Sequence, residues 1–295
     1  MGKKGKKTLT GKPKKPTPKD IGKRLDALVK KLEEELKGAD LFAPLLPTED
    51  CAICLVPLSR VRPETVFKVC CGKDICKACH KENEASIKKQ NEENADKNVA
   101  FTCPFCREPV PTDRFEYFRQ LQARSLQNDR NALMLVGNCY LYGDDGAPKD
   151  NLQALDCFIR AVELGSAEAC TCIKIIYDEG RGVPVDRRKA TFFAKVGALR
   201  GEIVARHNIG YAEYYDLRNY EIAIRHWKIA AEAGSQISLN ALKNIYSANG
   251  KRSGKNFITK EYLDFAYRAC HEAQMEVKSE EREKYRCKTS TKFKC

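Results

Sequence analysis

The sequence predicts a small cysteine-rich domain followed by an all-α solenoid of paired helices. Two observations support this prediction. Eight cysteines fall in four pairs between residues 51 and 106, and the chain after about residue 112 repeats its own pattern with a period near 36 residues. The chain has 295 residues, enough for about two domains. Apolar residues make up 42% of it, so the composition allows an apolar core.

Residues 1–20 form a lysine-rich tail that we expect to be disordered. Residues 2–19 hold eight lysines, three prolines and no acidic residue, within a chain of formal net charge +13. Such a segment cannot bury enough apolar surface to offset the entropy lost on ordering. The tail could contact nucleic acid, acidic protein or anionic lipid, or merely solubilise the chain. Nucleic acid is the least favoured partner, because no aromatic residues lie between the lysines to stack on bases.

A short amphipathic helix is predicted after the tail. Apolar residues recur at helical spacing over residues 21–38, at Ile21, Leu25, Leu28, Val29, Leu32 and Leu36. This stripe spans barely two heptads, which favours packing against the chain's own core over a coiled coil. Pro44 and Pro47 mark a boundary, so residues 21–45 are interpreted as a helix and linker.

The sequence contains no recognisable targeting signal. No segment approaches the ~18 consecutive apolar residues of a membrane span, and no apolar run follows the basic N-terminus. Met-Gly at the start is typical of myristoylation, but Lys6 stands where that signal needs Ser or Thr. We therefore expect a cytoplasmic or nuclear protein without a membrane span. Cysteines stay reduced there, so paired cysteines indicate metal binding before disulfides.

The eight paired cysteines predict two structural zinc ions. The pairs are Cys51/Cys54, Cys70/Cys71, Cys76/Cys79 and Cys103/Cys106. Three pairs have two intervening residues, a spacing that brings two thiolates to one tetrahedral zinc. So small a segment depends on its metal for stability, since structural zinc contributes ~10–16 kcal/mol. Four thiolates per ion leave no open position for an activated water, which argues against a hydrolase.

The segment resembles a RING domain at ECAICLVPL, CCGKDICKAC and CPFCREPV. The resemblance implies a small zinc-stabilised α+β domain over residues 46–112, in which alternate pairs share an ion. Carried over to this chain, Cys51, Cys54, Cys76 and Cys79 hold the first ion, and Cys70, Cys71, Cys103 and Cys106 hold the second. RING domains commonly place a histidine where this chain has Lys73, whose ammonium has no lone pair for zinc. Cys70 is the natural substitute, giving an all-cysteine variant, and His80 is the alternative ligand.

RING domains typically act as ubiquitin-protein ligases, which position a ubiquitin-conjugating enzyme and its thioester-linked ubiquitin without a covalent intermediate. Ile53 and Pro104 match the positions at which the conjugating enzyme docks, and Arg107 matches the activating cation, the catalytic position. Each also has a plain structural interpretation: Ile53 as a cover of the zinc site, Pro104 in a turn and Arg107 as a solvated charge. The charged segment between Cys79 and Cys103 can form the helix expected there, but it lacks the tryptophan of many RING domains.

Small residues recur in equivalent places after residue 112. One helix of each unit carries Ala132, Ala169, Ala205 and Ala241, followed four residues on by Val136, Ile173, Ile209 and Ile245. The second helix carries Ala154, Ala190, Ala223 and Ala266, followed seven residues on by Ala161, Gly197, Ala230 and Ala273. Small residues two turns apart let neighbouring helices approach closely. The larger Phe158 and Trp227 are expected to fill the remaining space in the first and third units.

Glycine turns ending in aspartate connect the helices of the first two units, in GDDGAPKD (143–150) and GRGVPVD (180–186). The sequences of these turns resemble those of the Sel-one-like repeat family, and an array of tetratricopeptide repeats is the alternative. We interpret residues 113–280 as this repeat array and residues 281–295 as a basic tail. The histidines His207 and His226 lie outside the cysteine clusters and are expected to pack or face solvent. The cysteines Cys139, Cys157, Cys170, Cys172 and Cys270 are expected to be small core residues.

Two functions are carried forward. In the first, the chain is a RING-type ubiquitin-protein ligase whose repeats bind a protein substrate or adaptor, since solenoids present extended protein-binding surfaces. In the second, it is a non-catalytic, zinc-binding scaffold for protein interactions. Whether the chain is an enzyme is left open by the sequence.

Overall fold

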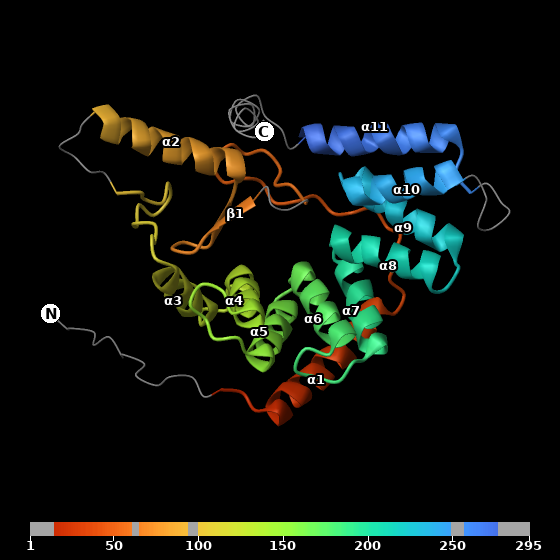
Figure 1. Ribbon diagram of the computed structural model, residues 1–295, viewed down its shortest axis with the longest axis horizontal. Helices are drawn as coiled ribbons and strands as arrows, with labels where there is room; N and C mark the ends of the chain where they lie inside the picture. Colours follow the sequence, from red (N-terminus) through yellow and green to blue (C-terminus); the bar gives the residue numbers. More distant parts are fainter. Residues whose placement is uncertain (1–14, 61–64, 94–99, 249–256, 277–295) are drawn as a thin grey trace.

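The computed structural model describes residues 15–60, 65–93, 100–248 and 257–276. Its helices are α1 (Pro18–Leu36), α2 (Lys77–Glu93), α3 (Arg114–Ser125), α4 (Arg130–Tyr142), α5 (Asn151–Glu163), α6 (Ala167–Glu179), α7 (Arg187–Leu199), α8 (Ile203–Tyr215), α9 (Tyr220–Glu232), α10 (Gln236–Ala248) and α11 (Lys260–Glu276), and its strands are β1 (Thr65–Lys68) and β2 (Lys73–Cys76). Helices α3 to α11 follow one another around an open arc (Figure 1). The region of β1, β2 and α2 lies beside the first helices of the arc. Most of the predicted N-terminal tail and the whole predicted C-terminal tail lie outside the described residues.

Helix α1 begins at Pro18, three residues earlier than predicted. Thr17 is its N-cap: the Asp20 N–H donates to Thr17 Oγ1 at 3.3 Å, and the Thr17 N–H donates to Asp20 Oδ2 at 3.2 Å. This reciprocal pair is a capping box, and proline suits the first helical position because its missing N–H would have no helical partner. The last three residues assigned to the tail, residues 18–20, therefore belong to the helix.

Helix α1 packs on the outside of the arc, against α5 and α7 (Figure 1). Its predicted apolar stripe is buried in the same core as α4 to α7, through Ile21, Leu25, Leu28 and Leu32, with Val29 and Leu36 partly buried beside them. Glu35 accepts two hydrogen bonds from the Arg200 guanidinium, at 2.9 and 2.8 Å. Packing against the chain's own core is thus confirmed, and no coiled coil is needed to cover the stripe.

The linker after α1 stays in contact with the array. The buried Arg206 side chain, from α8, donates to the carbonyl oxygens of Leu41 and Ala198. The Phe42 ring lies 4.8 Å from the His226 ring, centroid to centroid, and the Arg225 guanidinium carbon lies 3.6 Å from the Phe42 centroid. Residues 17–42 therefore connect α5, α7, α8 and α9 from one side.

The core of the array follows the repeating pattern of small and large residues. The predicted small residues of the first three units are buried, at Ala132, Ala169, Ala205, Ala154, Ala190, Ala223, Ala161, Gly197 and Ala230. In the first unit the Phe158 ring lies over Gly137, where a Cβ would stand 2.5 Å from Phe158 Cε1. In the third unit Trp227 lies over Gly210 in the same way, with 2.7 Å to Nε1. Each aromatic ring thus fills space that a glycine in the preceding helix leaves free.

The predicted turns between paired helices are confirmed in the first two units. Asp150 accepts from the Gln153 N–H and Asp186 accepts from the Lys189 N–H, each at 3.0 Å, so both aspartates cap the following helix. Gly143 and Gly180 end the preceding helices with φ of 76° and 69°, a conformation that glycine adopts without steric cost. In the described part of the chain, no helix combines the length and apolar character needed to cross a bilayer.

Candidate metal centres

A β-hairpin and one helix carry the two middle cysteine pairs. Strands β1 and β2 pair antiparallel, with Thr65 opposite Cys76 and Lys68 opposite Lys73. The loop between them, residues 69–72, holds Cys70 and Cys71. Cys76 ends β2, and Cys79 lies in the first turn of α2. Strand β2 therefore separates the second pair, in the hairpin turn, from the third pair at the start of α2.

The first and last cysteine pairs lie on two loops of the same backbone geometry, which we call knuckles (residues 51–56 and 103–108). In one, the Leu55 N–H donates to the Cys51 carbonyl at 2.9 Å; in the other, the Arg107 N–H donates to the Cys103 carbonyl at 3.0 Å. Leu55 and Arg107 both have a left-handed backbone, with φ of 55° and 60°. Non-glycine residues adopt this conformation at an energetic cost. Two distant segments are therefore folded to the same tight turn around their cysteines.

The eight sulfur atoms converge in two clusters. The first cluster is Cys51, Cys54, Cys76 and Cys79, and the second is Cys70, Cys71, Cys103 and Cys106; within each, the four sulfurs lie within 4.8 Å of one another. Four sulfurs held tetrahedrally at ~2.3 Å from one ion stand ~3.8 Å apart. The separations of 3.9 Å between the Cys54 and Cys76 sulfurs and 3.7 Å between those of Cys71 and Cys103 match this spacing. Both clusters could hold a zinc ion.

The thiols within each cluster differ in pKa. Burial alone would raise the pKa of the Cys51 thiol, but N–H groups of Cys54, Cys76 and Ile53 lower it to about 7. In the second cluster, burial is likewise outweighed at Cys103 by the N–H groups of Cys106 and Phe105, and its pKa is also about 7. Burial raises the pKa of Cys70 and Cys79. The knuckles thus stabilise one thiolate per cluster, as metal ligation requires.

His80, the alternative ligand, lies outside both clusters. Its Nδ1 is 3.0 Å from the Lys68 ammonium, and its Nε2 is 3.6 Å from Glu84. Burial and then the neighbouring Lys68 charge lower the pKa of His80. Cys70, in contrast, lies in the second cluster. The donor set of that cluster therefore consists of four cysteines, and Lys73 points to solvent.

The three residues matched to partner and catalytic positions lie on the knuckles. Ile53 is 41% exposed, beside Leu55 at 74%. Pro104 is half-buried and Arg107 is exposed. Phe105, next to Pro104, packs against the residues around the first cluster. The second knuckle thus contributes a sulfur pair to one cluster and an aromatic ring to the other.

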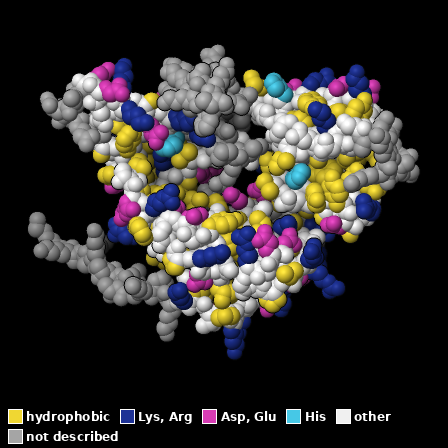
Figure 2. Space-filling model, viewed as in Figure 1, with side chains coloured by type: hydrophobic (Ala, Val, Ile, Leu, Met, Phe, Trp, Pro, Cys, Tyr) yellow, Lys and Arg dark blue, Asp and Glu magenta, His cyan; other side chains and the backbone are white. Residues whose placement is uncertain are grey.

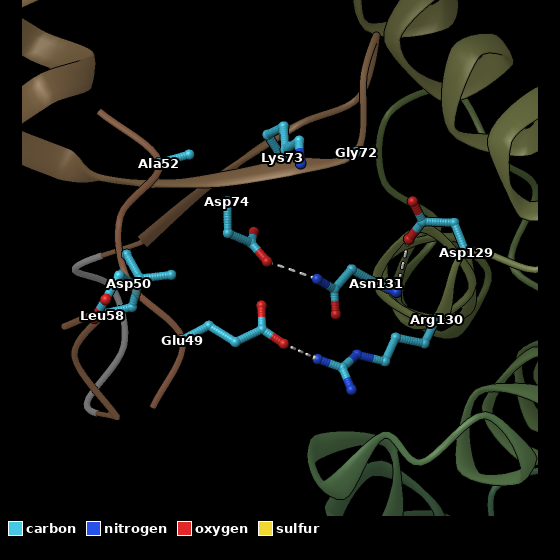
Figure 3. Close-up of a pocket in the computed structure, with 10 residues that line it drawn as sticks. All are labelled: Glu49, Asp50, Ala52, Leu58, Gly72, Lys73, Asp74, Asp129, Arg130 and Asn131. Carbon is cyan, nitrogen blue, oxygen red and sulfur yellow. Dashed lines mark hydrogen bonds and ion pairs between the residues drawn. The ribbon is translucent and has the colours of Figure 1, made fainter. Parts of the chain in front are cut away.

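A polar pocket lies where the cysteine-rich module, residues 46–112, meets the array. Its cavity volume is ≈ 330 Å³. Figure 3 shows acidic side chains from the module facing the start of α4: Arg130 Nη2 donates to Glu49 Oε1 at 2.9 Å, and Asn131 Nδ2 donates to Asp74 Oδ2 at 2.7 Å. The first contact joins residues that are 81 positions apart in the sequence, and the second joins residues that are 57 positions apart. Sequence reasoning missed both contacts, because no local pattern signals them.

The array has recognisable relatives. The Sel1 repeat family model matches residues 130–166, 175–202 and 203–235. Among solved structures, a Sel1 repeat protein from Oxalobacter formigenes is 24% identical, covering 66% of this chain and 75% of that one, with a TM-score of 0.46. A protective antigen of uropathogenic Escherichia coli with an SLR fold is 22% identical, with a TM-score of 0.47; 67% of this chain is covered, and the match spans 40% of the antigen.

The other features expected of the array agree with this match. His207 Nδ1 lies 3.0 Å from Ser238 Oγ, and His226 is buried against Phe42, so both histidines pack. Four of the five remaining described cysteines are buried and Cys172 is half-buried. The family matches begin at residue 130 and so do not extend to the cysteine clusters. The three matched segments, which form the core of the helical arc, are therefore Sel1 repeats.

Proposed function

We propose that the chain is a zinc-dependent RING-type ubiquitin-protein ligase whose Sel1 repeats hold a protein substrate or adaptor. The interleaving of the cysteines supports this proposal most strongly. The first pair joins the third and the second joins the fourth, so that each cluster draws on segments more than twenty residues apart. That alternation is the arrangement implied by the RING resemblance. A pair of consecutive, independent zinc loops would join neighbouring pairs instead.

The exposed surface of the knuckles suits a partner enzyme. Ile53 and Leu55 project apolar side chains, and the exposed Arg107 adds a guanidinium. Apolar groups can bind one protein, and a fixed fork of donors can bridge carbonyl oxygens of a second. In the proposed reaction, the knuckles would orient the conjugating enzyme and its ubiquitin, and no residue of this chain would bond to ubiquitin.

The array supplies the surface for a second protein. Figure 2 shows hydrophobic side chains gathered over α8 and α9, on the arm of the arc far from the module. Tyr211, Tyr215 and Leu217 are among the exposed apolar residues of this arm, at 53%, 39% and 60%. Exposed aromatic residues are enriched at protein interfaces. In this proposal a client would be held there, on the arm of the arc away from the module.

A non-catalytic scaffold is the competing function, and one observation favours it. Helix α2 buries only Cys79 and Ile87, and the single tryptophan of the chain is Trp227, buried in α9. The groove that a RING tryptophan would line is therefore built differently here. In this alternative, the zinc-bound module would hold a protein without activating it.

Ubiquitin-chain formation by the full-length chain with a panel of conjugating enzymes separates the two functions. The sharpest variant is Arg107→Gly, because glycine fits the left-handed backbone at this position and leaves the knuckle intact. We expect Arg107→Gly to bind two zinc ions and to lose activity by on the order of 100-fold, as when one positioned donor is removed. Arg107→Lys keeps the positive charge but lacks the forked guanidinium, so its activity should lie between that of the unaltered chain and that of Arg107→Gly.

Arg119→Gly is a poor control, since glycine would weaken α3 by about 1 kcal/mol. Arg119→Gln removes an exposed guanidinium that pairs with Glu116, and this variant should be fully active. Zinc content is measured by elemental analysis for every variant. Two bound ions with no activity toward any conjugating enzyme would establish the scaffold instead. Full activity in Arg107→Gly would remove Arg107 from the mechanism.

A further inference from the structure

The loop that carries Cys70 and Cys71 is held by a side chain from outside the cysteine-rich module. Arg124, in the last turn of α3, donates from Nε to the Val69 carbonyl at 2.7 Å and from Nη2 to the Cys70 carbonyl at 2.9 Å. Its Nη1 donates to Asp129 Oδ2 at 3.1 Å. The side chains of Arg124 and Asp129 are each only 18% exposed. One guanidinium thus connects two carbonyls of the cysteine loop to a carboxylate of the array.

The loop lies so close to this pair that only glycine fits at its end. Gly72 has a φ of 71°, and a Cβ there would stand 2.7 Å from Asp129 Oδ2 and closer still to Arg124 Nη1. Val69, at the other end of the loop, is buried among Phe118, Leu121 and other residues of α3 and α4. The backbone on both sides of the two cysteines is therefore fixed by the array.

Asp129 connects the same contact to the first Sel1 repeat. Its Oδ1 accepts from the N–H groups of Asn131 and Ala132, each at 3.0 Å, and so caps α4. Asn131 in turn donates to Asp74 of β2 (Figure 3). Cap, guanidinium and cysteine loop form one hydrogen-bonded unit that spans both parts of the molecule.

The array meets the segments of the first cluster through side chains: Arg130 donates to Glu49 and Asn131 donates to Asp74, each two residues before a cysteine of that cluster. The apolar residues packed around its cysteines are Leu58, Ile75, Val66, Ala78 and Phe105, all within residues 46–112. A ligand loop that is already ordered loses less entropy when it binds an ion, and outer contacts of this kind commonly affect metal affinity. The two clusters therefore differ in how the array contacts them, because a guanidinium holds the backbone carbonyls of the cysteine loop only in the contacts described for the second cluster.

We propose that Arg124 is a positioning residue for the second cluster, so that metal binding there is coupled to the fold of α3 and α4. The inference rests on the zinc binding of the proposed function, but not on ligase activity. Coupling of this kind is reciprocal. Loss of the guanidinium weakens the second site, and loss of the second ion loosens the first helical pair.

Cadmium-113 NMR of the full-length chain tests whether loss of the Arg124 guanidinium weakens the second site. Each four-sulfur site gives its own resonance, assigned through coupling to its cysteine Hβ protons, and titration with a chelator reports the affinity of each site. Arg124→Gln should lower the affinity of the second site about 10- to 100-fold, the usual effect of losing an outer contact, and leave the first unchanged. Arg119→Gln, in the same helix but 77% exposed and paired with Glu116 on the helix surface, should change the affinity of neither site.

Amide hydrogen exchange tests whether loss of the second ion loosens α3 and α4, and this test leaves Arg124 unaltered. Cys106→Ser removes one ligand of the second cluster, and exchange should then rise in residues 114–136 and stay unchanged in α8 and α9. Equal affinities in Arg124→Gln and the unaltered chain, an equal fall at both sites, or unchanged exchange in Cys106→Ser would each overturn the inference alone. Fewer than two bound ions in the unaltered chain would overturn the proposed function and this inference together.

Discussion

The cysteine-rich module and the Sel1 array reach a fixed structure by different means. In the array, glycines and alanines leave room that Phe158, Trp227 and neighbouring helices fill, so apolar burial itself orders the chain. In the module, the described residues form two four-residue strands and one helix that buries only two side chains. Eight sulfur atoms in two clusters lie at its centre, and we propose that metal bound there orders the module. The same small side chain thus has a different setting in each region: cysteine fills the core in α6, whereas in the knuckles it belongs to a four-sulfur cluster that could hold a metal ion.

Metal removal should produce the largest difference between the two regions. Structural zinc contributes ~10–16 kcal/mol per site in small domains, more than the module's few buried residues can replace. We therefore expect a chelator to abolish amide protection in β1, β2 and the knuckles. The array should keep its helical circular dichroism and the protection of α5 to α9.

Cobalt or zinc added back should restore the module, which serves as the control for reversibility. A metal-depleted chain that still protects the β1–β2 amides would show that the module folds by burial, as the array does. The comparison between the two regions would then fail.

Acid should destabilise the array through one buried imidazole. Burial, and then the charges of Arg206, Arg225 and Lys195, lower the pKa of His226 from 6.5 to about 4. Between these values the unfolded chain binds the proton more readily, so stability falls as the pH drops from about 6.5 to 4 and is unaffected above that window. From pH 7 to pH 5 the loss due to His226 is about 2 kcal/mol.

Urea unfolding of α9, followed by Trp227 fluorescence at both pH values, measures this loss. His226→Leu should reduce the difference between pH 7 and pH 5 by that amount, whereas replacement of the exposed His271 should not. Because acid also protonates thiolates, only the difference between variants is informative. An unchanged pH dependence in His226→Leu would mean that the imidazole has the same pKa in the folded and the unfolded chain.

Two glycine substitutions give the smallest effects, with opposite signs. In Gly137→Ala the new Cβ would meet the buried Phe158 ring at 2.5 Å, and overpacking of this kind costs about 1–3 kcal/mol. In Gly22→Ala, in α1, nothing lies within 4 Å of the new Cβ, so the higher helix propensity should stabilise by about 0.5–1 kcal/mol. Thermal unfolding measures both, and zinc content should not change. A stabilised Gly137→Ala would show that the core of the array is not closely packed.

The sequence predicts most of the array and the convergence of the cysteines, because both depend on how residues of one type are spaced along the chain. Small residues every ~36 positions and pairs of cysteines two residues apart have few structural solutions. The predicted start of α1 was wrong by three residues, although Thr17, Pro18 and Asp20 form a capping pattern that could have located it. The role of Arg124 could not be predicted: one arginine in a polar helix looks like a surface charge, and its partners Val69 and Cys70 lie more than fifty residues away. Contacts of that range follow from the assembled fold and leave no local pattern.

The attachment of the cysteine-rich module at both of its ends limits how it can move. On one side, Arg206 and His226 hold Leu41 and Phe42; on the other, α3 continues directly into the array. A domain on a single flexible tether sweeps out a volume, whereas one anchored twice can at most rock about the line through its anchors. Any protein bound in the arc would therefore lie at a nearly constant distance from the knuckles. That distance would determine which part of the bound protein the knuckles can reach.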